Sequence, residues 1–153
     1  MFDGPEMRID QSIAREVEAN RIIELIKELV SKNPGRNLDI GIISFYKGQV
    51  KVIKEKLDEN FPKSVLDNIS CNTVDSYQGK EFDIVILSGV RSNTSSSPEK
   101  SLGFIHHSAS RINVALSRAK KLLVVVADAD TYRKTPHFQN FISYVKKEGY
   151  YGQ

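Results

Sequence analysis

Residues 73–87, TVDSYQGKEFDIVIL, decide the fold of this chain, and residues 111–126, RINVALSRAKKLLVVV, repeat their plan. Each stretch joins a polar segment to a run of apolar residues that is typical of a buried β-strand. In the first, residues 78–81 form a tight polar turn before the strand, and in the second Arg118 ends a short helical pattern. Open α/β sheets bind ligands where charged residues flank the ends of buried parallel strands. We therefore expect both stretches to supply residues to one exposed edge of a sheet.

The composition is that of one soluble globular domain. The chain has 153 residues, of which 40% are apolar and 27% are charged, so it can bury a real core. No apolar run approaches the length of a membrane span, and we expect no membrane partner. The single cysteine, Cys71, excludes an internal disulfide and indicates a reducing compartment, which we take to be the cytoplasm, or also the nucleus in a eukaryote. A net charge of +3 is too mild to indicate a nucleic-acid partner by itself.

Helical and strand patterns alternate along the chain. Apolar residues at helical spacing predict helices at about residues 12–31, 50–61, 112–119 and 136–149. Short apolar runs predict strands at residues 39–44, 69–73, 82–90 and 121–128. Residues 92–101 (SNTSSSPEKS) contain no apolar residue and predict an exposed, mobile loop. The alternation predicts a single three-layer α/β domain over residues 1–153, with a mainly parallel sheet of about five strands.

Three blocks in this chain resemble motifs IV, V and VI of superfamily-1 helicases, in the branch that contains senataxin and the nonsense-mediated-decay helicase. They are residues 40–50 (IGIISFYKGQV), residues 73–87 and residues 111–127. The likeness covers roughly residues 12–128, and it implies a RecA-like fold of the P-loop NTPase type. Such helicases hold ATP between two RecA-like domains, and the motifs present here are those of the second. No Gly-x-x-x-x-Gly-Lys-Ser/Thr pattern occurs, so the first RecA-like domain is an implied partner.

The resemblance implies an ATP site completed by residues of motifs V and VI. Arg118 matches the arginine finger, whose guanidinium stabilises negative charge on the γ-phosphate. Gly79 and Glu81 match positions that approach the γ-phosphate through the backbone and the ribose through a carboxylate, and Gln78 matches one that links nucleotide state to nucleic-acid binding. Arg111 either faces the same cleft or pairs with an acidic neighbour. ATP and Mg²⁺ are the implied cofactors, held mainly by the first domain.

Each of these residues also has an ordinary structural interpretation. Arg118 would then cap the C-terminal end of a helix, and Gly79 would be a common turn glycine. Gln78 would be an exposed turn amide, and Glu81 an exposed loop charge. The flanking residues 113–117 (NVALS) favour the arginine finger.

A second set of residues is placed by the resemblance to contact single-stranded DNA or RNA. The set is Thr73, Asp75 and Ser76 in motif V and Ser44, Tyr46 and Gln49 in motif IV. Hydroxyl groups suit phosphate contacts, and an aromatic ring stacks on a base or packs beside a sugar. For Tyr46 the alternative is a half-buried aromatic residue that opens a helix.

The chain departs from the helicase pattern at two places. Phe45 stands where motif IV usually has proline. Residues 12–19 (SIAREVEA) resemble a Ser-x-x-Asn-x-x-Glu-Ala pattern with Arg15 in the Asn place, and Glu16 stands where some relatives have a second phosphate-sensing arginine. We therefore do not count a second phosphate-sensing arginine among the site residues, and Arg15 is the alternative to it.

The remaining polar clusters predict structural roles. His106, His107 and His137 have no carboxylate or cysteine at ligand spacing, so we predict no metal site. Asp128 and Asp130 follow the last strand and are interpreted as turn and capping residues.

Three functions are compatible with these patterns. The first is the second RecA-like domain of an ATP-dependent helicase or translocase, which alone would hydrolyse no ATP because the P-loop is missing. The second is a non-enzymatic nucleic-acid-binding or interaction module of helicase ancestry. The third, an unrelated doubly wound domain that binds a small nucleotide, predicts a glycine-rich loop after the first strand, but residues 44–48 (SFYKG) contain one glycine.

Overall fold

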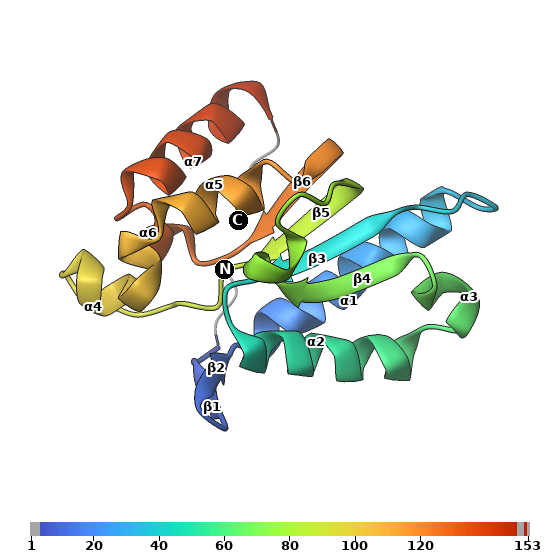
Figure 1. The fold of residues 1–153 in the computed structure, drawn as a ribbon, viewed down its shortest axis with the longest axis horizontal. Helices are drawn as coiled ribbons and strands as arrows, with labels where there is room; N and C mark the ends of the chain where they lie inside the picture. The colour runs from blue at the N-terminus through green and yellow to red at the C-terminus, as the bar shows by residue number, and fades with distance from the viewer. Residues whose placement is uncertain (1–3, 150–151, 153) are drawn as a thin grey trace.

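The computed structural model of the protein describes residues 4–149 and 152, and its centre is a parallel sheet with strand order β4-β3-β5-β6 (Figure 1). The strands are β3 (Ile40–Ser44), β4 (Ile69–Thr73), β5 (Phe82–Ser88) and β6 (Ala119–Val126). Ser44 pairs in register with Thr73 on one side and Ser88 on the other, so the carboxyl ends of β3, β4 and β5 share one edge, as expected. The α/β class is confirmed, although this sheet has four strands and not about five.

Helices cover both faces of the sheet, as Figure 1 shows, and this confirms the three-layer arrangement. The long helices are α1 (Glu16–Lys32) and α2 (Lys47–Asn60) on one face, and α5 (Ala109–Leu116) and α7 (Pro136–Glu148) on the other. Ile42 and Ile86 enter the core beneath α1 and α2. Ile43 and Leu87, the next residues along each strand, enter the opposite core. Because successive strand side chains point to opposite faces, these uninterrupted apolar runs supply two cores at once.

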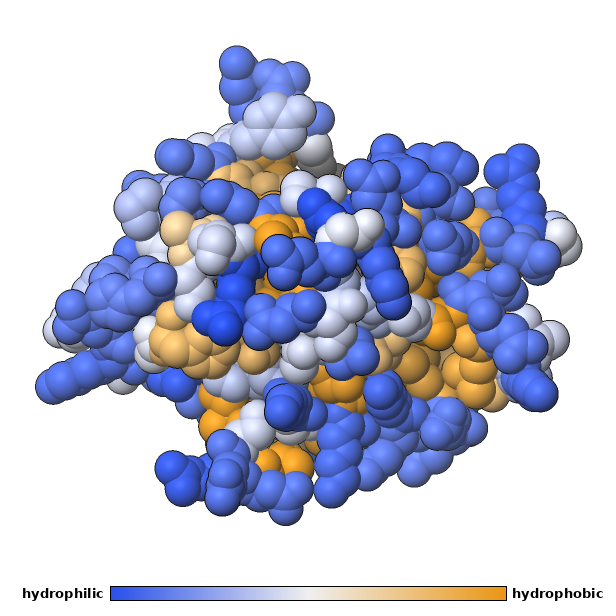
Figure 2. Space-filling view, viewed as in Figure 1, coloured by the Kyte–Doolittle hydropathy of each residue, from blue (hydrophilic) through white to orange (hydrophobic). Residues whose placement is uncertain are grey.

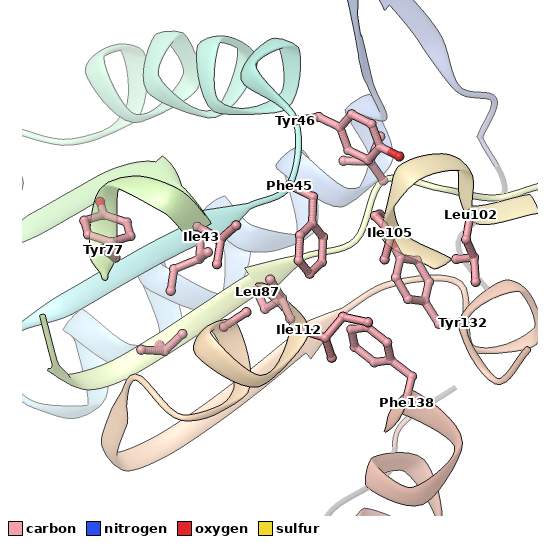
Figure 3. Packing of buried hydrophobic residues seen from close by; sticks show 14 of the residues in the cluster. Ile43, Phe45, Tyr46, Tyr77, Leu87, Leu102, Ile105, Ile112, Tyr132 and Phe138 are labelled. Carbon is pink, nitrogen blue, oxygen red and sulfur yellow. The ribbon is translucent and has the colours of Figure 1, made fainter. Parts of the chain in front are cut away.

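The core beneath α5 and α7 extends beyond the sheet to the turn that follows β3. Figure 3 shows Phe45 and Tyr46 from this turn packing in the same cluster as Ile105 and Phe138. Phe45, which replaces the usual proline of motif IV, is therefore a buried core residue.

The shorter elements connect these layers. They are β1 (Met7–Ile9), β2 (Ser12–Ala14), α3 (Lys63–Leu66), the 3₁₀ helices η1 (Val74–Tyr77) and η2 (Gly103–His107), α4 (Pro98–Leu102) and α6 (Ala129–Tyr132). No helix among the described residues is long and apolar enough to cross a membrane.

The first helix begins later than its apolar pattern predicts. Ser12–Ala14 is a strand that pairs antiparallel with Met7–Ile9, so the expected helix start near residue 12 is wrong. Arg15 is extended, and its backbone N–H donates to Gln49 Oε1 at 2.8 Å, which leaves Glu16 as the first helical residue.

Two strand boundaries also differ from the expected ones. β5 ends at Ser88 because Val90 adopts a positive φ of 77°, which a β-branched residue in a strand does not. β6 begins at Ala119, which the apolar spacing had assigned to the preceding helix. Ala119 pairs with Phe82, so pairing with the neighbouring strand determines where this strand begins.

The serine-rich segment at residues 92–101 is held against the body of the protein, and the expectation of an exposed loop is wrong for much of it. Lys134 Nζ donates to Ser95 O at 2.6 Å and to Ser101 Oγ at 2.7 Å. Asn93 Nδ2 donates to Ser101 O at 2.9 Å, and Ser101 is fully buried. Polar residues here bond to one another, and the segment needs no apolar residues to pack.

A buried carboxylate connects α1 to the end of β5. Glu18 Oε2 accepts hydrogen bonds from Ser88 Oγ at 2.7 Å and from the Val90 N–H at 2.9 Å, and Glu18 Oε1 pairs with Arg15 Nη1 at 3.2 Å. Gln49 on α2 joins them by donating from Nε2 to Ser88 Oγ at 2.9 Å. Burial raises the pKa of Glu18, while the hydrogen bonds from Ser88 and Val90 and the Arg15 charge oppose that rise. The network therefore joins α1, α2 and β5.

We predict that Glu18→Ala lowers the free energy of unfolding by about 3 kcal/mol or more, because it breaks a buried pair and removes the acceptor of Ser88 and the Val90 N–H. Urea unfolding at neutral pH measures this loss. Glu24→Ala is the matched control on the same helix, since the Glu24 side chain is 64% exposed and pairs only at the surface with Arg21. It should cost about 0.5 kcal/mol or less. Equal losses for the two variants would contradict a structural role for the network.

Candidate functional site

The loop at residues 78–81 and Arg118 lie side by side at the amino-terminal ends of β5 and β6. Arg118 Nη1 donates to Lys80 O at 3.3 Å, and the Phe82 N–H at the start of β5 donates to Arg118 O at 2.9 Å. We call Gln78, Gly79, Glu81 and Arg118 the amino-edge cluster. The sequence predicted that Gly79, Glu81 and Arg118 meet at one exposed edge, and the structure brings them together there.

The guanidinium of Arg118 is bound only to neutral acceptors. Nε donates to Val114 O at 3.1 Å, and Nη2 donates to Ser117 Oγ at 3.0 Å. None of the ion pairs formed by the described residues involves Arg118. Arg118 thus caps the end of α5, as the structural interpretation proposed, and its positive charge stays uncompensated and partly exposed.

Gly79 provides the turn of the amino-edge cluster. Its φ is +79°, and a Cβ added there would meet nothing within 4 Å. Glycine is therefore required by the backbone conformation and not by crowding. Gln78, Lys80 and Glu81 beside it are all exposed, so both backbone and side chains face open space.

We predict that Gly79→Ala costs about 1 kcal/mol of stability, which is the strain of a positive φ without a steric clash. Gly35→Ala is the matched control, because Gly35 has a φ of +72° and a Cβ added there would also meet nothing within 4 Å. Urea unfolding should give similar losses for the two variants. A loss above roughly 3 kcal/mol for Gly79→Ala alone would require a tertiary contact that the structure does not contain.

A small hollow lies at the opposite edge of the sheet, next to the carboxyl ends of β3 and β4. Its volume is about 290 Å³, and it is lined by Phe45, Lys47, Thr73, Val74, Asp75, Phe104 and Arg111. We call it the carboxyl-edge hollow. Arg111 Nε pairs with Asp75 Oδ1 at 3.0 Å, and its guanidinium carbon lies 5.8 Å from the centroid of the Phe104 ring.

The structure therefore separates Arg111 from Arg118. Arg111 is in the first turns of α5 and Arg118 follows its end, about 10 Å further along the axis at about 1.5 Å per residue. Of the two roles considered for Arg111, pairing with an acidic neighbour is the one observed. The structure thus places Arg111 at the carboxyl-edge hollow and not in the amino-edge cluster.

The three motif V residues predicted to contact a strand lie at the surface beside the hollow. Asp75 and Ser76 are exposed, and Thr73 is partly exposed. Thr73 Oγ1 and Ser76 Oγ lie 3.4 Å apart, so the two hydroxyl groups are close enough to contact the same ligand group.

The three motif IV residues are buried. Ser44 is 1% exposed, and its hydroxyl donates to Ser88 O at 3.2 Å. Gln49 is fully buried, and its amide bonds to Arg15 and Ser88. Tyr46 is 8% exposed and packs its ring against Phe104, and burial raises its pKa to about 12. In this structure the three side chains support the turn after β3 and offer little surface to a strand, and their contact with a strand stays a prediction.

Two other expectations are settled by the surroundings of the residues. Arg15 is 3% exposed, donates from Nε to Gly4 O at 2.8 Å and pairs with Glu18, so it faces the interior and not a phosphate. Asp128 accepts hydrogen bonds from the backbone N–H groups of Asp130 and Thr131, which confirms the interpretation of Asp128 as a cap.

The histidine pair has a carboxylate neighbour that sequence spacing did not reveal. Glu99 offers an oxygen within 4.8 Å of a nitrogen from each of His106 and His107. The premise that no carboxylate lies near these histidines is therefore wrong, because α4 and η2 fold back on each other.

Phe104 and the Lys80 carbonyl are parts of these two sites that the sequence analysis missed. Phe104 belongs to no helical or alternating pattern of apolar residues in the sequence. A backbone carbonyl group is present in every residue, so the sequence does not mark the one at Lys80.

Comparison with known proteins identifies the family of the chain. The family described as AAA domain matches residues 3–130, which include both the amino-edge cluster and the hollow. The chain belongs to this family. It is 33% identical over 148 residues to senataxin of Homo sapiens, described as a probable helicase, and 35% identical over 150 residues to the DNA replication ATP-dependent helicase/nuclease JHS1 of Arabidopsis thaliana.

These relatives are much longer than this AAA domain. The alignments cover 96% and 97% of the chain but 5% of senataxin and 10% of JHS1. The DNA replication ATP-dependent helicase/nuclease DNA2 of Gallus gallus matches 74% of the chain at 35% identity, over 11% of its own length. The resemblance to helicases of the senataxin branch is thereby confirmed.

Proposed function

We propose that this chain is the second RecA-like domain of an ATP-dependent helicase or translocase, and that it completes the ATP site of that protein with Arg118. The observation that carries the proposal is the position of the Arg118 guanidinium, which is held beside the loop at residues 78–81 by neutral acceptors alone. The helicase names of relatives many times longer than the chain support the same function.

The amino-edge cluster fits one side of a bound nucleotide. Arg118 offers an uncompensated planar cation, which suits phosphate oxygens. Gly79 leaves the backbone of the turn open to close approach, and the exposed carboxylate of Glu81 suits the hydroxyls of a ribose. Bound ATP would supply the γ-phosphoryl group and the charge that these residues recognise.

The same cluster does not fit Mg²⁺ by itself. Mg²⁺ prefers carboxylate, phosphate and water oxygens in octahedral geometry. Among the described residues, the group with metal-ligand spacing is Glu99 with His106 and His107, which is rich in nitrogen and belongs to different elements. The magnesium ligands and the P-loop are therefore assigned to another domain.

Arg118 would act by exchanging partners. In the structure it donates to Val114 O and Lys80 O, both neutral. A phosphate oxygen adds an attraction between opposite charges that a neutral carbonyl oxygen does not offer, so the exchange is favourable once a partner domain brings a phosphate within reach. The gain is largest when negative charge on the transferring group peaks, which is the condition for catalysis.

The carboxyl-edge hollow would bind single-stranded DNA or RNA in the same protein. Thr73 and Ser76 offer hydroxyl groups to a backbone phosphate, and Lys47 lines the hollow beside them. Motif V passes directly from Thr73 to Gly79, so one short segment touches both proposed sites. In the proposed protein, η1 would connect movement at one site to movement at the other.

The competing function is a non-enzymatic interaction module, and the capping geometry of Arg118 is the observation that favours it. The two functions differ in the role of Arg118. In an interaction module Arg118 caps a helix, so its loss would lower stability and leave ATP turnover unaffected.

We predict that the purified 153-residue chain shows no magnesium-dependent ATP hydrolysis above background, because it has no P-loop lysine. Phosphate release measured with the chain at high concentration tests this. Robust hydrolysis that survives repeated purification would overturn the assignment to a second RecA-like domain.

The decisive prediction concerns Arg118→Ala in a protein that joins this chain to its P-loop domain. Turnover of ATP should fall on the order of 10³-fold, roughly 4 kcal/mol of barrier, with little loss of nucleotide affinity. Arg118→Lys should restore little, since an ammonium group cannot make the planar two-pronged contact.

The matched control is Arg133→Ala, which removes an arginine that ends α6 and pairs at the surface with Asp130. It should leave turnover unchanged. If Arg118→Ala stayed within about threefold of wild type, a difference under roughly 1 kcal/mol, Arg118 would be a helix cap and the interaction module would be the better function.

A further inference from the structure

Phe104 is an exposed aromatic residue that none of the motifs explains. The residue is 44% exposed, and the other large apolar residues exposed in the described part of the chain are Leu122 and Tyr144. The face seen in Figure 2 is mostly hydrophilic, with several apolar patches between the polar side chains. A single exposed ring beside the charged residues Lys47, Asp75 and Arg111 fits a small flat ligand better than a broad protein interface.

The ring of Phe104 is held in place by its neighbours. Tyr46 packs against it at 5.3 Å between centroids with the rings inclined at 66°, and the guanidinium of Arg111 lies 5.8 Å from its centroid. Arg111 is itself anchored by Asp75 at 3.0 Å. An exposed ring fixed in this way loses little conformational freedom when a ligand stacks on it.

The surroundings of Phe104 match the chemistry of a nucleotide unit. The ring borders the carboxyl-edge hollow, where Lys47 offers a positive charge and Thr73 a hydroxyl group. Lys47 is also the first residue of α2, whose first turn contains no acidic residue, so the helix dipole adds to the positive potential. A flat ring beside phosphate-binding groups is the arrangement that binds single strands without sequence preference.

We propose that Phe104 is the stacking platform for one unpaired base of a single-stranded nucleic acid, whose adjoining phosphate is bound by Lys47 and Thr73. This inference rests on the proposed function and deepens it, because it names the residue that contacts a base. Arg111 positions the ring, and Asp75 positions Arg111.

A tryptophan reporter tests the stacking directly, because the chain contains no tryptophan. In the Phe104→Trp variant, a single-stranded thymidine oligonucleotide of about 12 nucleotides should quench the indole fluorescence, and an abasic oligonucleotide of the same length should not. Tyr144→Trp is the matched control, because Tyr144 is an aromatic residue on α7 that is 64% exposed. Its fluorescence should not respond to either oligonucleotide.

Affinities measured by fluorescence anisotropy at low salt complete the test. Phe104→Ala should weaken binding of the thymidine oligonucleotide about tenfold and leave binding of the abasic one unchanged, whereas Lys47→Ala should weaken binding of both and reduce its salt dependence.

If the wild-type chain binds the thymidine oligonucleotide but Phe104→Ala binds it equally well, the stacking inference is overturned and the proposed function stands. If the wild-type chain binds neither oligonucleotide, the strand site fails together with the inference, while the role of Arg118 is judged separately by ATP turnover.

Discussion

The buried carboxylate of Glu18 sets how the helices of one layer sit on the sheet. A carboxylate is costly to remove from water unless each of its oxygens finds a partner, and here the partners come from the end of β5, from Arg15 and, through Ser88, from Gln49 on α2. Shifting α1 along the sheet would break these bonds together. The network therefore also determines where the turn after β3 lies, and with it one wall of the carboxyl-edge hollow.

The parallel sheet divides motif V between two edges. β4 and β5 run in the same direction with β3 between them, so the chain must return from the carboxyl edge to the amino edge before β5 begins. η1 and the loop at residues 78–81 make this return. The polar residues of one short motif consequently lie at opposite ends of the sheet, and α5 spans the same interval between Arg111 and Arg118.

This division explains why both candidate sites are incomplete. The amino-edge cluster provides a cation and an open turn but no oxygen ligands for a metal, and the hollow is shallow and bordered by a single exposed ring. In the proposed function, a second domain that closes on this one would complete both sites. The small share of each relative that the chain spans agrees with such a role.

The sequence by itself determined where the strands β3, β4 and β5 lie and which helix Thr135 caps. These follow from apolar runs, turn residues and caps, which act between neighbours in the chain. The meeting of Arg118 with the loop at residues 78–81 joins residues 38 apart, and it was expected from the resemblance to helicases and not from a local pattern. Only the tertiary structure decided that Gln49 and Ser44 are buried, that Arg111 pairs with Asp75 and that Phe104 borders a hollow. Each of these outcomes depends on a partner far away in the chain: Gln49 bonds to Arg15 across 34 residues, and Val90 reaches Glu18 across 72. A polar side chain looks the same in sequence whether it faces water or a buried partner, because only the packed fold brings that partner within hydrogen-bond distance.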